Sequence, residues 1–82
     1  MGKKIKLIWD FYGEDALQVA KHHAIHLNDY VTKTAIKAIE IDSIEFSDHA
    51  EAYIIVEEQH LVQVRDQLRP KRGQWVEETP ET

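Results

Sequence analysis

The alternation of apolar and polar residues along residues 4–12 predicts a first β-strand. Side chains of a strand point alternately to its two faces. One face carries the more apolar set Ile5, Leu7, Trp9 and Phe11, and the other carries Lys6, Ile8, Asp10 and Tyr12. Gly13 ends the strand, and the acidic pair at 14–15 places negative charge where the start of a helix favours it.

A helix is predicted to follow and to run to about Thr32, because apolar residues recur at helical spacing. They form the seam Leu17, Ala20, Ala24, Leu27 and Val31. At 100° per residue, His22 lies nearly opposite this seam, His26 well away from it, and His23 on its border. The segment 22–26, which holds three of the five histidines in the chain, is therefore mainly an outward face.

A second strand is predicted around residues 39–46. Ile39 and Ile41 alternate with acidic residues, and the phase then slips so that Ile44 and Phe46 take over the apolar face. A β-bulge near residues 42–43 is the expected cause of the slip.

The remaining pattern predicts a third strand over residues 50–58 and a short helix that ends by Arg69, because Pro70 cannot continue it. A brief fourth strand is expected over residues 74–78 and carries Trp75. Residues 76–82 are expected to fray. No linker or repeat divides the chain, so residues 1–82 form a single domain.

The order of predicted elements is β-α-β-β-α followed by a short fourth strand, and it indicates an α+β fold of the split βαβ type. The third strand is expected between the first two and antiparallel to both, with two helices on one face of the sheet. This arrangement resembles the ferredoxin-like superfold. Pairing through the open face resembles the dimeric α+β barrel group, in which two such units enclose a cavity.

Composition narrows the class of protein. The 82 residues support one modest core, which favours a homodimer. The net charge of −5 argues against nucleic-acid binding, which needs a basic face. The chain has no cysteine for a disulfide and no apolar run of membrane-spanning length. We therefore expect a small cytoplasmic protein with no membrane partner.

The open sheet face is the predicted ligand-binding surface. Its expected members are Ile8, Asp10, Tyr12, His49, Glu51, Tyr53 and Ile55. The antiparallel order brings the end of the first strand beside the start of the third, so the polar members should gather at one end. A carboxylate beside a histidine fixes its tautomer and raises its proton affinity.

Three functions are compatible with this pattern. The first is a non-enzymatic homodimer that binds a small ligand or a partner through the open face. The second is a small enzyme of the dimeric α+β barrel type, with His49 as acid or base, Asp10 as its orienting group, and Tyr12 or Tyr53 as a proton donor. The third is weak binding of a divalent metal by His22 and His26, whose i, i+4 spacing lets two imidazoles share an ion. No other cofactor is expected.

Overall fold

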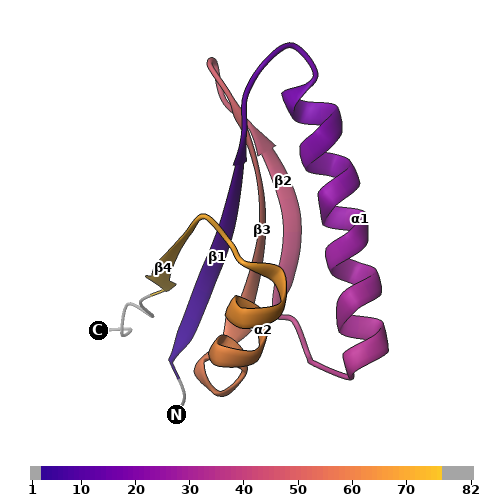
Figure 1. The fold of residues 1–82 in the computed structure, drawn as a ribbon. Coiled ribbons are helices and arrows are strands. Elements are labelled where there is room, and N and C mark those ends of the chain that lie inside the picture. The colour runs from indigo at the N-terminus through magenta and orange to yellow at the C-terminus, as the bar shows by residue number, and fades with distance from the viewer. Residues whose placement is uncertain (1–2, 77–82) are drawn as a thin grey trace, which may run out of the picture.

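The computed structural model describes residues 3–76 as an antiparallel four-stranded sheet with two α-helices (Figure 1). The elements are β1 (Lys4–Phe11), α1 (Ala16–Thr34), β2 (Glu40–Glu45), β3 (Ala50–Glu57), a 3-10 turn (Glu58–His60), α2 (Leu61–Leu68) and β4 (Arg72–Val76). The α+β fold is therefore confirmed, and its strand order and helices fit a ferredoxin-like type of fold.

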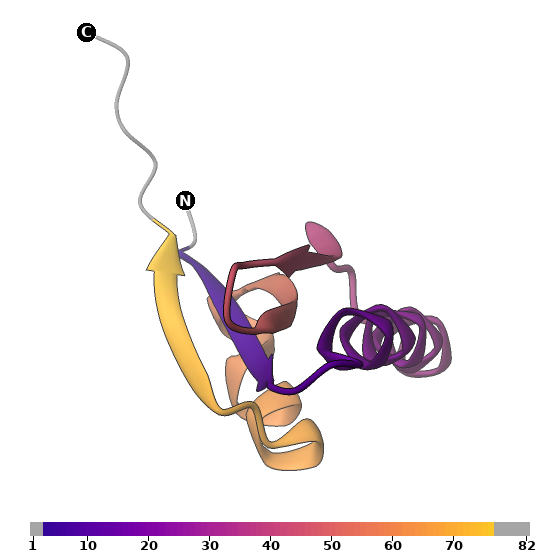
Figure 2. The same ribbon diagram turned by 90° about the horizontal axis from the view of Figure 1, so that it is seen from above.

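The strands lie in the order β2-β3-β1-β4. β3 is central and pairs antiparallel with both β1 and β2, as predicted, while β4 adds to the outer side of β1. Both helices lie on the same side of the sheet (Figure 2). No described element covers the opposite face, which is called the open face below.

The main core lies between the sheet and the helices. Trp9 and Ile54 face the helices as the strand phase predicts, and Trp9 donates a hydrogen bond from Nε1 to the backbone oxygen of Leu68 at 3.2 Å. Other buried members of this core are Ile5, Leu7, Leu27, Ile36, Val56 and Val64.

A second apolar cluster lets the start of α1 approach the sheet closely. Its four buried members are all alanines: Ala16 and Ala20 from α1, and Ala50 and Ala52 from β3. A methyl group is the smallest side chain that still excludes water, so helix and strand meet here with little between them. This contact fixes the end of the sheet at which β1 enters α1 and at which β2 turns into β3.

One sequence-based expectation is wrong. The register of β2 against β3 is continuous from Glu40–Ile55 to Glu45–Ala50, without a bulge near Asp42 and Ser43. Because the alternation is not interrupted, Ile44 points to the open face beside Glu51 instead of joining the helix side. The apolar pattern had two phases because the open face itself accepts apolar residues.

Element boundaries differ slightly from expectation. β4 begins at Arg72, two residues before the predicted start, and α1 continues to Thr34 before Ala35 leaves the helix in a left-handed conformation. The second helix starts with a 3-10 turn and ends at Leu68, just before Arg69. The expected fraying of the tail falls mostly on residues 77–82, which lie outside the described residues. Neither described helix combines the length and the apolar composition needed to cross a membrane.

Candidate functional site

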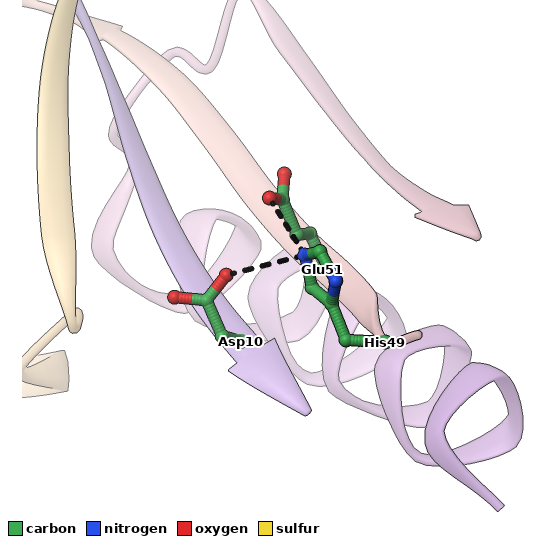
Figure 3. Close-up of side chains that lie close together, drawn as sticks. All are labelled: Asp10, His49 and Glu51. Carbon is green, nitrogen blue, oxygen red and sulfur yellow. Dashed lines mark hydrogen bonds and ion pairs between the residues drawn. The ribbon is translucent and has the colours of Figure 1, made fainter. Parts of the chain in front are cut away.

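The ends of β1 and β3 bring a polar cluster together on the open face. Asp10 and Glu51 are direct cross-strand partners, and His49 stands two residues before Glu51, on the same side (Figure 3). The Nε2 atom of His49 lies 3.4 Å from Glu51 Oε2 and 3.9 Å from Asp10 Oδ1. The juxtaposition that strand phase predicts is thus present, although its role as a site stays a prediction.

Arg72 joins the cluster from the neighbouring strand. Its partner across the sheet is Ile8, so its side chain emerges on the open face, diagonal to Asp10. The guanidinium donates two hydrogen bonds to the Asp10 carboxylate, from Nε to Oδ2 at 3.1 Å and from Nη2 to Oδ1 at 3.0 Å. Nη2 also donates a hydrogen bond to Glu51. These hydrogen bonds from Arg72 lower the pKa of Asp10, and the carboxylate in turn raises the pKa of Arg72.

His49 is held by carboxylates at both of its ring nitrogens. Nδ1 lies 2.6 Å from Oδ1 of Asp48 in the turn between β2 and β3, and Nε2 faces Glu51. The rings of Phe46 and Tyr12 stack on the imidazole, with centroids 4.8 Å and 5.5 Å away. The Asp48 hydrogen bond is the largest cause that raises the pKa of His49 above its ordinary value.

This geometry favours the doubly protonated imidazolium, because each ring nitrogen faces a carboxylate that accepts a hydrogen bond from its N–H. A general base needs a free lone pair on one nitrogen. The partner that orients His49 most closely is Asp48, at 2.6 Å, and not Asp10, whose carboxylate is held by Arg72. The arrangement is therefore better suited to a fixed charged network than to acid–base turnover.

The same groups form a set that is capable of binding metal. Ligand atoms of Asp10, His49 and Glu51 lie within 4.8 Å of one another. Nη2 of Arg72, however, bonds to the two carboxylate oxygens that face His49, so the guanidinium takes the place that a cation would occupy. While Arg72 stays in this position, the set does not fit a divalent ion.

The raised pKa of His49 predicts a pH dependence of stability. A histidine whose pKa is higher in the folded state contributes stability that is complete below its ordinary pKa of 6.5 and is lost as pH rises through the folded value. We expect the difference in unfolding free energy between the wild type and His49→Gln to be larger at about pH 6 than at about pH 8.5 in urea titrations. His60→Gln supplies the matched loss of a histidine outside the cluster. A difference that does not change with pH would contradict the charged network.

The apolar members of the predicted surface are largely covered within the single chain. Ile8 is 1% exposed and Tyr53 is 5% exposed, while Ile55 is half-buried. The Lys6 ammonium lies 4.2 Å from the centre of the Tyr53 ring, and the Tyr53 hydroxyl donates to Glu40. Burial, followed by the Glu40 hydrogen bond, raises the pKa of Tyr53 to about 12. Tyr53 therefore anchors β2 to β3 more than it offers a free proton donor.

A groove of about 390 Å³ lies beside the cluster, between the start of α1 and the turn that joins β2 to β3. His49 and Phe46 belong to its lining, with Leu17 on the α1 side. Tyr12 is 72% exposed and Phe46 is 43% exposed. The cluster thus ends in a rim of exposed aromatic surface beside a groove.

The helix histidines are arranged as the seam predicts. His22 and His26 are exposed, and their Nε2 atoms lie 3.0 Å apart. His23 is half-buried, with its ring 4.6 Å from that of Trp9 between centroids. Burial is the main cause that lowers the pKa of His23, and among the described residues its Nε2 atom has no hydrogen-bond partner.

Sequence reasoning missed three members of the cluster: Arg72, Asp48 and Phe46. Arg72 lies before the predicted fourth strand of residues 74–78, whereas β4 begins with it. A signal was available, since extending the strand that holds Trp75 back by two residues places Arg72 opposite Ile8. Asp48 and Phe46 belong to the tight turn after β2, whose side-chain directions do not follow from alternation.

Comparisons with protein-family models, curated proteins and solved structures found no match. Folds of the ferredoxin-like type carry many unrelated functions. The open face and its cluster are therefore the features that bear on function.

Proposed function

We propose that this chain is a non-enzymatic homodimeric binding module, in which the open face of one copy docks on the open face of another. The small-ligand site of the proposal is the groove beside His49 and Phe46, at the end of that face. The observation that carries the proposal is the position of Lys6 on β1 and of the acidic residues Glu40 and Asp42 on β2, at separate places on the open face.

Arg72, Asp10 and Glu51 are paired with one another on the open face, and the other charged side chains that bear on dimerisation lie on separate strands. Lys6 projects from β1, whereas Glu40 and Asp42 project from the far strand β2. A two-fold axis parallel to the strands would set the β2 edge of each copy over the β1–β4 side of the other. Both sets of opposite charges would then meet, which is the complementarity that fixes register in a self-association interface.

The apolar surface of this face is modest. Ile44 and Ile55 are half-buried, Phe46 is partly exposed, and Ile8 is already covered. Interfaces with little apolar area depend on charge pairs, and dissolved salt weakens these pairs by screening their charges. We therefore expect a weak dimer whose dissociation constant is on the order of 100 μM and rises with ionic strength.

Charge reversal on each side of the face tests the proposal. Lys6→Glu and Asp42→Lys should each weaken self-association at least about tenfold, because each sets like charges opposite one another in both halves of a symmetric dimer. Mixing the two variants should restore association, since opposite charges then face each other at both contacts. Lys21→Glu makes the same charge change on α1, away from the open face.

Light scattering and sedimentation at a series of concentrations give the readout. A wild type that stays monomeric up to roughly 100 μM at low salt would overturn the dimer. Equal effects of Lys6→Glu and Lys21→Glu would show that net charge alone, not the open face, controls association.

For the ligand site, a thermal-shift screen of small metabolites on the wild type and on Phe46→Ala tests the groove. A metabolite that stabilises the wild type and Phe46→Ala equally would exclude the groove as its binding site.

A further inference from the structure

His22 and His26 stand one turn apart on α1. This helix is 19 residues long, and both histidines lie more than one turn from its ends. Both side chains are exposed, and their ring planes are nearly perpendicular, at 86°, with centroids 4.5 Å apart. The rings do not stack. Each instead turns its Nε2 atom toward the other, and the two nitrogens are 3.0 Å apart.

That separation suits two donors to one metal ion. With metal–nitrogen bonds of about 2.0–2.1 Å, a tetrahedral angle sets the donor atoms about 3.3 Å apart, and a right angle sets them about 2.9 Å apart. The observed 3.0 Å lies between these values. The two nitrogens therefore need little change in separation to share an ion, and the helix backbone already holds both side chains on one side.

We propose that His22 and His26 form a binding site for one divalent transition-metal ion of the Zn²⁺, Ni²⁺ and Cu²⁺ class. Imidazole nitrogen suits these ions and does not suit Mg²⁺ or Ca²⁺, which prefer oxygen ligands. Among the described residues no third histidine, aspartate or glutamate joins the pair to make a larger ligand set. Water therefore completes the coordination, and the site is open and exchanges its ion readily.

This site is separate from the cluster on the open face. The pair lies on the exposed side of α1, and α1 covers the opposite side of the sheet from Asp10 and Glu51 (Figure 2). The proposal is independent of the proposed dimer. The two sets of possible metal ligands also differ. In the Asp10 set the guanidinium of Arg72 takes the place of the cation, whereas no arginine of residues 3–76 hydrogen-bonds to His22 or His26.

Isothermal titration of the full, untagged chain with Zn²⁺ and with Ni²⁺ tests the site. We expect one ion per chain with an affinity on the order of micromolar, and no measurable binding of Mg²⁺ under the same conditions. His22→Ala and His26→Ala should each weaken Zn²⁺ binding at least about tenfold, because one imidazole alone holds the ion. His60→Ala removes a histidine outside the pair and should leave the affinity unchanged.

A hydrogen bond between two neutral imidazoles would also bring the rings together, and the titration separates the two cases. Absence of Zn²⁺ binding at millimolar concentration would mean that the pair is only hydrogen-bonded, and it would overturn the proposal. So would wild-type affinity in His22→Ala, or an equal loss in His60→Ala. Because the histidines are exposed on a helix, circular dichroism should report the same helix content in both alanine variants.

Discussion

Replacing Arg72 with methionine should lower the unfolding free energy by about 2 kcal/mol. The substitution leaves the Asp10 and Glu51 carboxylates side by side on β1 and β3 without the guanidinium between them. The Glu51 side chain is only 8% exposed, so water replaces the lost partner poorly. Loss of one partner of a fully buried ion pair costs about 3–5 kcal/mol, and the lower figure expected here reflects the 47% exposure of Arg72.

Urea denaturation of a double-mutant cycle measures this effect. Glu51→Gln removes one of the two carboxylates, so Arg72→Met should cost less in the Glu51→Gln background than in the wild type. Arg65→Met is the matched control, because Arg65 pairs with Asp66 at 3.1 Å on an exposed surface and should contribute at most about 0.5 kcal/mol. If Arg72→Met costs no more than Arg65→Met, the cluster is a surface network of little consequence.

Replacing Ala20 with leucine should be more disruptive, with an expected cost of about 3 kcal/mol. Ala20 is 0% exposed and packs against the buried alanines of β3. Three additional carbon atoms cannot fit between helix and strand unless α1 moves away from the sheet. Because the start of α1 lines the groove beside His49, the substitution should also change the environment of that ring.

Thermal and urea unfolding give the cost, and the NMR signals of the His49 ring give the local effect. Lys21→Leu is the control, since it adds a leucine at the next, exposed position of the same helix and should change stability by no more than about 0.5 kcal/mol. Equal stability of Ala20→Leu and Lys21→Leu would mean that α1 does not pack closely on β3.

The sheet and the centre of the cluster could be predicted because strand alternation fixes the side on which each residue emerges. Alternation alone places Trp9 under the helices and Asp10 on the open face, and antiparallel pairing then brings Asp10 beside Glu51. Alternation does not decide on which face a residue lies where both faces of the sheet accept apolar residues. The apolar pattern predicts Ile44 on the helix side for that reason, and the continuous register places it on the open face.

The partners within the cluster could not be predicted, because they depend on side-chain directions at the ends of elements. Asp48 reaches His49 from a tight turn, and Arg72 reaches Asp10 from the first residue of a short edge strand. The covering of Ile8 and Tyr53 likewise depends on how long polar side chains fold over the sheet, as Lys6 does above the Tyr53 ring. The periodicity of the sequence carries no information on these conformations.

The open face as a self-association surface is tested most directly by following backbone amide NMR signals while the wild type is diluted. Between roughly 1 mM and 20 μM, the proposed weak dimer predicts shifts on the open face, at Lys6, Asp42 and Tyr53, with α1 signals such as that of Lys21 unchanged. Spectra that do not change with concentration, or shifts confined to α1, would contradict it.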